Sequence, residues 1–134
     1  MELNEYQVKA MTTCMDSCNN ISYMLINLVG EVGEFSSKIA KGIRKGQFTI
    51  GGEGKVQANQ LIFWKEDIDK FANFEKIQEE LKKEAGDILW QLSGLCAAMD
   101  WTLEDVAQMN LDKLAARKKA GTIDGNGDGI IRDK

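Results

Sequence analysis

Two pairs of carboxylates with helical spacing are the residues of this chain best suited to chemistry. Glu31 and Glu34 form one pair, and Glu84 and Asp87 form the other, with three positions between the members of each. At about 100° per residue, this spacing puts both side chains of a pair on one face of a helix. Four carboxylates held together repel one another unless a cation lies among them, and ligation by oxygen alone suits Mg²⁺ or Mn²⁺.

The position of Glu84 is unusual for a charged residue. Apolar residues recur at three- and four-residue steps through this segment, and Glu84 stands between Leu81 and Ile88 where the series requires an apolar residue. A carboxylate in the core of a bundle loses solvation, so it should be neutralised, paired or bound to a metal. The alternative is structural: Glu84 pairs with a lysine, and Glu34 pairs with Lys38 on the surface.

The absence of histidine narrows the choice of metal. A helical bundle with internal carboxylates could be a di-iron protein, in which E-x-x-H motifs complete the ligand set. The chain has no histidine, which excludes that set and leaves hard cations. A phosphate chain is then the natural substrate, because divalent ions bridge its oxygens and make an attacking water more acidic.

The elements that must position these carboxylates are helices. The chain lacks proline, and its apolar residues recur at helical spacing, which predicts an all-α fold: a helical bundle of four main helices. Asn4, followed by Gln7, is the predicted N-cap of the first helix, and Thr102 is that of the fourth. The predicted helices span about 4–18, 21–44 and 73–98, with the last starting at Thr102.

Length and composition favour one soluble domain over residues 1–134, with a variable loop at about 46–70 and an irregular tail at about 121–134. The net charge of −4 argues against duplex nucleic acid as a partner. No apolar run is long enough to span a membrane, and the N-terminus lacks a secretory signal, so we expect a cytoplasmic protein with reduced cysteines.

Several other side chains are candidates for substrate binding. Lys38 lies in a basic group near the end of the second helix, where the helix dipole alone also explains such residues. Lys113 and Arg117 lie four residues apart in the predicted fourth helix, on one face, and could contact phosphates. Trp90 and Trp64 could stack on a base, although core packing is an equal alternative for Trp90.

These motifs resemble the MazG-like branch of the all-α nucleoside triphosphate pyrophosphohydrolases. The resemblance covers most of the chain. Its motifs are Asn4-Glu5-Tyr6-Gln7, Gly30-Glu31-Val32-Gly33-Glu34, Glu84 to Trp90, Asn110 to Leu114, Arg117, Gly121-Thr122-Ile123, Gly125 to Asp128 and Arg132.

The resemblance implies Mg²⁺-dependent cleavage between the α and β phosphates, which releases a nucleoside monophosphate and pyrophosphate. It implies that the metal ligands are Glu31, Glu34, Glu84 and Asp87. Among these catalytic carboxylates, Glu31 is the preferred base for activating water. The resemblance also implies substrate contacts from Asn110 and Arg132, whereas a buried register-setting residue is the structural alternative for Asn110.

Met24, Leu89 and Met99 are apolar but lie outside the series of apolar residues that predicts the inner face of each helix. They leave apolar surface to cover, which predicts self-association, and the resemblance implies a homodimer or homotetramer. Two other functions remain open. One is a non-enzymatic helical interaction module whose carboxylates form ion pairs. The other is a calcium-binding module in the 124–134 tail, which matches the first half of an EF-hand loop but ends before the bidentate glutamate.

Overall fold

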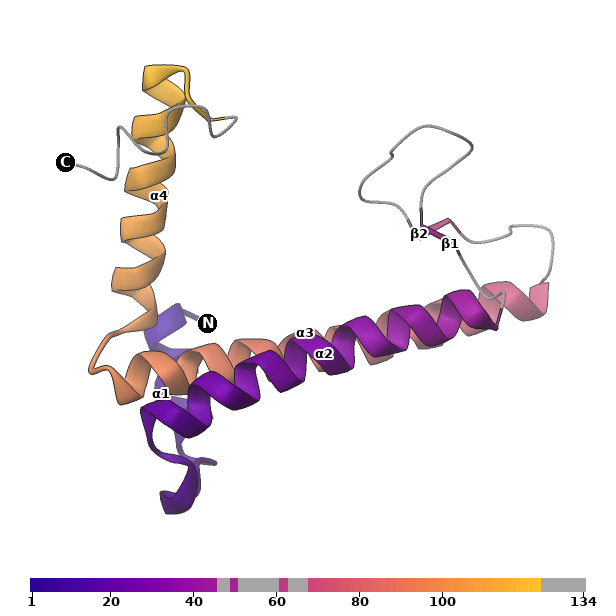
Figure 1. The fold of residues 1–134 in the computed structure, drawn as a ribbon, viewed down its shortest axis with the longest axis horizontal. Coiled ribbons are helices and arrows are strands. Elements are labelled where there is room, and N and C mark those ends of the chain that lie inside the picture. Colours follow the sequence, from indigo (N-terminus) through magenta and orange to yellow (C-terminus); the bar gives the residue numbers. More distant parts are fainter. Residues whose placement is uncertain (46–48, 51–60, 63–67, 124–134) are drawn as a thin grey trace.

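The computed structural model describes residues 1–45, 49–50, 61–62 and 68–123. Four α-helices dominate this part of the chain and confirm the predicted all-α fold (Figure 1). A single 3₁₀ turn, η1, covers Asp16–Cys18, and two short strands, β1 (Thr49–Ile50) and β2 (Leu61–Ile62), pair antiparallel in the region predicted to be a loop with a small element. The helices are α1 (Leu3–Met11), α2 (Ile21–Arg44), α3 (Ile68–Ala98) and α4 (Leu103–Ala120).

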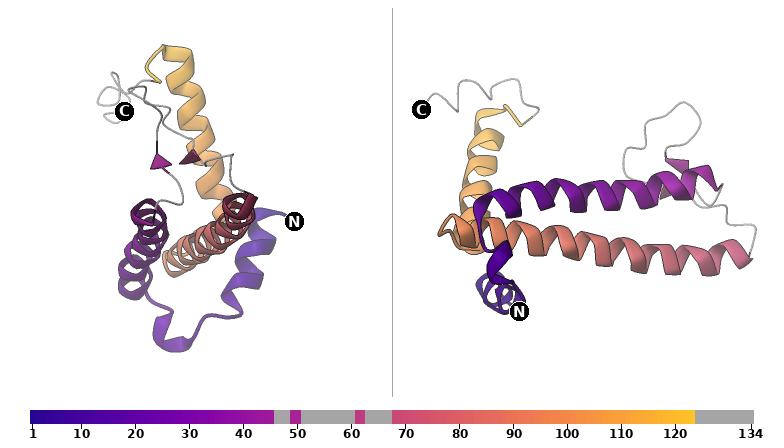
Figure 2. Two further views of the ribbon diagram at one scale, coloured as in Figure 1. Left: turned by 90° about the vertical axis from the view of Figure 1, so that its right-hand side faces the viewer. Right: turned by 60° about the horizontal axis from the view of Figure 1, so that its bottom comes forward.

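The two longest helices, α2 and α3, lie side by side as an antiparallel pair (Figure 2). Asn20 caps α2, because its side-chain oxygen accepts a hydrogen bond from Tyr23 N at 2.8 Å. The interior near the start of α2 holds Met24 together with Gln91 of α3. Met24 was expected to lie off the apolar face and leave surface for self-association, but this expectation was wrong, because it is completely buried. Polar as well as apolar side chains therefore fill the contact between the helices that carry the carboxylates.

α1 packs against α3 and links it to the base of α4. The Gln7 side chain donates to Ser93 O at 3.3 Å and to Trp101 O at 3.0 Å, and it accepts from Leu103 N at 3.0 Å. The predicted Thr102 cap is present, since its hydroxyl accepts from Asp105 N at 3.2 Å. Beyond this base, α4 extends away from the α2–α3 pair (Figures 1 and 2).

The first helix is shorter than predicted and begins differently. It ends at Met11 rather than near residue 18, because the Thr12 and Thr13 hydroxyls donate to the backbone oxygens of Lys9 and Ala10 and compete with helical hydrogen bonding. Its N-cap residue is Glu2, not Asn4. The Asn4 side chain instead binds Glu104 at the start of α4 through two hydrogen bonds.

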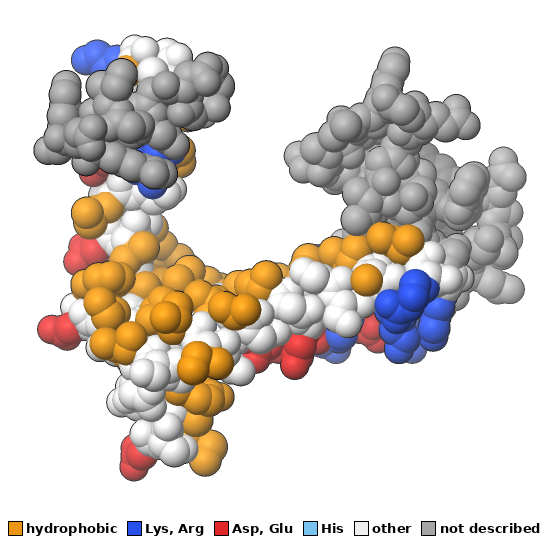
Figure 3. All heavy atoms as spheres, viewed as in Figure 1, with side chains coloured by type: hydrophobic (Ala, Val, Ile, Leu, Met, Phe, Trp, Pro, Cys, Tyr) orange, Lys and Arg blue, Asp and Glu red, His pale blue; other side chains and the backbone are white. Residues whose placement is uncertain are grey.

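The third helix begins at Ile68, earlier than the predicted residue 73. Apolar residues of the predicted seams are only partly covered by this chain. The helical spacing of Ile21, Leu25 and Val32 in α2, and of Leu92 in α3, predicts that they face inward, but all four are exposed. Figure 3 shows apolar side chains spread over one face of the helices. Within the described residues, no helix has the length and apolarity needed to cross a membrane.

Candidate functional site

Three of the four predicted carboxylates meet between α2 and α3. Glu31 of α2 and both Glu84 and Asp87 of α3 each present an oxygen, and these three atoms lie within 4.8 Å of one another. The helical spacing of Glu84 and Asp87 puts them on neighbouring turns of one face, and the antiparallel packing brings Glu31 opposite them. The site therefore offers a set of ligand atoms made only of oxygen.

Glu84 is buried, as its place in the apolar series predicts. Only 9% of this residue is exposed. Its Oε1 forms an ion pair with Lys38 Nζ at 2.5 Å, whereas its buried Oε2 has no hydrogen-bond partner among the described residues. The structural alternative predicted such a lysine pair, but one lysine against three carboxylates leaves net negative charge and an unsatisfied oxygen.

The pKa of Glu31 also indicates an excess of negative charge at the site. Burial raises the pKa of Glu31, and the charges of Glu34, Asp87 and Glu84 raise it further, against the effect of a hydrogen bond from Asn27. A cation nearby would favour the ionised form of Glu31. Among the described residues, the three carboxylates therefore carry more negative charge than Lys38 neutralises.

These observations test whether a hard divalent cation fits the site. Such an ion requires several oxygen ligands, which Glu31, Glu84 and Asp87 supply. It also compensates like charges and satisfies an oxygen such as Glu84 Oε2, which is otherwise left without a partner. The residues present fit Mg²⁺ or Mn²⁺ on all three counts.

Glu34, the fourth predicted ligand, is exposed and lies outside the group of three. It is close enough for its charge to raise the pKa of Glu31. Lys38 reaches the cluster through its ion pair with Glu84, which raises the pKa of the lysine. The site therefore brings together five of the predicted residues, with Glu34 and Lys38 at its edge.

The other described candidates for substrate binding lie outside the group of carboxylates. The Trp90 indole N–H donates to Ala10 O at 3.1 Å and to Thr13 Oγ1 at 2.9 Å, so it attaches the end of α1 to α3. The candidates on α4 lie on a helix that leaves the α2–α3 pair: Asn110 and Lys113 are exposed, and Arg117 is half-buried. Trp64, Arg132 and the 124–134 tail lie outside the described residues.

Two residues at the site were not predicted to act there, Asn27 and Gln91. Asn27 Nδ2 donates to Glu31 Oε1 at 3.2 Å and to Gln91 Oε1 at 2.8 Å. A signal was available, because Asn27 lies one turn before Glu31 and Gln91 one turn after Asp87. In an antiparallel pair these two positions face each other whenever the carboxylates do.

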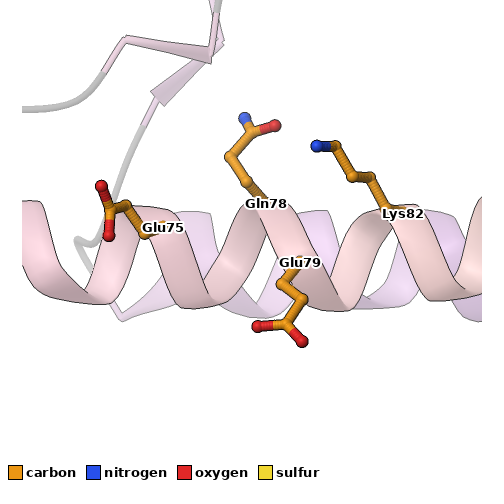
Figure 4. Close-up of a pocket in the computed structure, with 4 residues that line it drawn as sticks. All are labelled: Glu75, Gln78, Glu79 and Lys82. Atoms are coloured by element: carbon orange, nitrogen blue, oxygen red, sulfur yellow. The ribbon is translucent and has the colours of Figure 1, made fainter.

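A hollow farther along α3 does not gather its side chains in this way. It is lined by Glu75, Gln78, Glu79 and Lys82 and is open to solvent. Figure 4 shows Gln78 and Lys82 on one side of the helix and Glu79 on the opposite side, so these side chains do not converge on one point. Glu79 pairs instead with Lys83 along the helix at 3.3 Å.

Comparison with known proteins gives two matches. The family model of the MazG nucleotide pyrophosphohydrolase domain matches residues 19–122, a range that includes every described carboxylate of the site. The chain is also 30% identical to the "Gene 37 protein" of Mycobacterium phage L5 over 135 residues, which covers 96% of this chain and 98% of the phage protein. No solved structure matches the chain.

Proposed function

The chain belongs to the MazG nucleotide pyrophosphohydrolase family, and we propose that it hydrolyses a nucleoside triphosphate between the α and β phosphates, with Mg²⁺ as cofactor. The products are a nucleoside monophosphate and pyrophosphate. The observation that carries this proposal is the group of oxygens from Glu31, Glu84 and Asp87 within 4.8 Å, together with the buried Glu84 oxygen that has no partner in the described part of the chain.

In this proposal Glu31, Glu84 and Asp87 hold the metal, which Mn²⁺ can replace. When bound, a divalent ion supplies positive charge that offsets the charge of the phosphate chain and makes a nearby water more acidic. Glu84 is fixed by burial, Asp87 by its place on the next turn of α3, and Glu31 by its hydrogen bond to Asn27. Glu34 is a fourth ligand or a group that acts on the water.

The proposed base is Glu31, with Glu34 as the competing candidate. Glu31 has one oxygen engaged by Asn27, and Glu34 lies outside the three-carboxylate group. Isosteric amides separate the two roles. If Glu34 is the base, Glu34→Gln should lose turnover but keep Mn²⁺ binding. If Glu31 is both ligand and base, Glu31→Gln should lose both, and Glu34→Gln should keep turnover.

Lys38 is the proposed phosphate contact nearest to the cluster. Its ammonium forms an ion pair with Glu84. A divalent ion on Glu84 would take over that task, and the exposed lysine could then turn to the phosphate chain. In this way one side chain serves as a counter-ion before loading and as a substrate contact afterwards.

We also propose that the chain acts as a homodimer or homotetramer. Large apolar side chains of the described residues lie exposed on this chain: Ile26, Val29 and Met109 are 73%, 70% and 72% exposed. A second copy that covers them could bring its own α4, with Asn110, Lys113 and Arg117, toward the carboxylates.

The experiment is a pyrophosphate-release assay on a panel of ribo- and deoxynucleoside triphosphates, run with Mg²⁺, with Ca²⁺ alone and with a chelator. Release with Mg²⁺ that stops in Asp87→Asn would support the proposal. A non-enzymatic interaction module would release none with any nucleotide. Structural change induced by Ca²⁺ and lost on removal of residues 124–134 would favour the calcium-binding alternative.

A further inference from the structure

Two side-chain amides connect the carboxylate of Glu31 to the interior between α2 and α3. Asn27 Nδ2 donates both to Glu31 Oε1 and, at 2.8 Å, to Gln91 Oε1. Gln91 Nε2 donates in turn to the backbone oxygen of Met24 at 3.2 Å and to its sulfur at 3.0 Å. We call the pair Asn27 and Gln91 the amide relay.

The direction of each hydrogen bond in the relay follows from its two ends. The Glu31 carboxylate and the Met24 carbonyl can only accept, so each must face an N–H group. Asn27 therefore turns its nitrogen to Glu31, and its second N–H requires an acceptor, which Gln91 supplies. Reversing either amide would set two oxygens against each other, so the relay has one favourable orientation.

Gln91 and Asn27 differ in how deeply they are buried. Gln91 is 1% exposed, so it has no surface with which to touch a substrate in solvent. Asn27 is half-buried and lies between Gln91 and the carboxylate. The Asn27–Gln91 hydrogen bond also crosses from α2 to α3 one turn away from Glu31 and Asp87, and so fixes the register of the two ligand-bearing helices.

We infer that Gln91 is a positioning residue which, through Asn27, holds the Glu31 carboxylate beside Glu84 and Asp87 in the orientation that binds the metal. The inference rests on the proposed function for its metal. Partners in the outer shell orient metal ligands, and their loss typically weakens metal binding about 10- to 100-fold. Gln91 acts one residue further from the ion than Asn27, so its loss should have the smaller effect.

The test is the affinity of the full-length protein for Mn²⁺, measured by calorimetry without nucleotide. We expect Asn27→Ala to weaken binding by about tenfold, and Gln91→Met, which keeps the shape but removes the amide, by up to about tenfold. The two effects should not add, because Gln91 works only through Asn27. In the Asn27→Ala background, Gln91→Met should therefore leave the Mn²⁺ affinity unchanged.

Ser93→Ala is the matched control. Ser93 is as deeply buried on α3, and its hydroxyl donates to Leu89 O of the same helix at 2.8 Å rather than to α2. An equal loss of Mn²⁺ affinity in Ser93→Ala, or additive effects in the double variant, would overturn the inference by showing a general loosening of the core. If Gln91→Met does not fold, unchanged affinity in Asn27→Ala overturns it.

The same measurement separates this inference from the proposed function. A wild-type chain that binds Mn²⁺ without releasing pyrophosphate refutes the hydrolase proposal, while the variants still measure the relay. A hydrolase whose Mn²⁺ affinity does not respond to Gln91→Met refutes the relay alone. A wild-type chain that binds no Mn²⁺ refutes the positioning role together with the metal site.

Discussion

Met24 on α2 packs directly against Gly94 on α3. A Cβ added to Gly94 would lie 2.4 Å from the Met24 sulfur and 2.5 Å from its terminal carbon. Met24 has no exposed surface, and the same sulfur accepts a hydrogen bond from Gln91. The missing side chain at position 94 therefore permits the close approach of the two helices beside the amide relay.

Gly94→Ala should lower the free energy of unfolding by about 1–3 kcal/mol, because the buried Met24 must shift to make room. Urea denaturation measures this change. The matched control is Gly86→Ala on the same helix, where an added Cβ would meet nothing within 4 Å. That control should instead gain up to about 1 kcal/mol from helix propensity. Equal effects at the two glycines would contradict the packing described here.

Glu84→Gln should abolish pyrophosphate release and remove the stabilisation by Mg²⁺. If Glu84 is a ligand, the wild type gains about 2.7 kcal/mol at a Mg²⁺ concentration of 100 times Kd, and the variant loses that gain. Without metal the variant should be as stable as the wild type or more so, because one charge leaves a repulsive group. A variant that melts early at every Mg²⁺ concentration, yet still turns over nucleotide, would refute the ligand assignment.

Lys38→Met should tighten Mn²⁺ binding, because it removes the cation that competes for Glu84 Oε1. The same variant should melt earlier than the wild type in a chelator, where Glu84 loses its counter-ion. Mn²⁺ titration and thermal melting measure the two effects. Lys41→Met, an exposed basic residue of the same helix, is the control and should change neither. Weaker Mn²⁺ binding in Lys38→Met would show that the lysine does not compete with the ion.

The pKa of Glu31 is raised in the fold, chiefly by burial, so its effect on stability has a definite sign. Between the ordinary pKa of glutamate and the raised value, the folded protein binds more protons than the unfolded chain. The free energy of unfolding should therefore fall as pH rises through this interval and recover on acidification. Urea denaturation across this range, with a chelator present, should show the fall in the wild type and a smaller one in Glu31→Gln. Identical slopes would contradict the raised pKa.

Val29→Lys should lower the mass of the assembly, because Val29 belongs to the exposed apolar face of α2 and a charge would be buried in the interface. Light scattering at micromolar concentration measures the mass. Ser37→Lys, at an exposed polar position of the same helix, should leave it unchanged. A wild-type chain with the mass of a monomer would refute the proposed oligomer.

Local signals in the sequence were sufficient to predict the bounds of α2, the cap at Thr102 and the burial of Glu84. Each depends on residues within one or two turns. The end of α1 was predicted wrongly because the Thr12 and Thr13 hydroxyls bind the backbone, a competition that apolar periodicity does not register.

The amide relay was missed for a different reason. Asn27 and Gln91 are distant in sequence, and each is an ordinary polar residue until the register of α2 against α3 is known. Likewise, the apolar series predicted that Leu25 would pack against another surface, but it did not say which one. Leu25 is 52% exposed in this chain. Spacing thus predicted that these carboxylates share helix faces, whereas the amides bonded to Glu31 become apparent only from the packing of the two helices.

The hydrogen bonds from α1 hold α4 at its base, so a small rotation there produces a large displacement at the other end of α4. At about 1.5 Å per residue its 18 residues span about 27 Å, so a tilt of about 5° at the base moves the far end by about 2 Å. At this base, the side-chain oxygens of Gln7 and Asn4 accept hydrogen bonds from the backbone N–H groups of Leu103 and Glu104 in the first turn of α4. Substitutions at Gln7 would therefore shift the position of Arg117, near the far end of α4, without changing any carboxylate between α2 and α3. The short helix α1 thus determines the direction in which α4 extends.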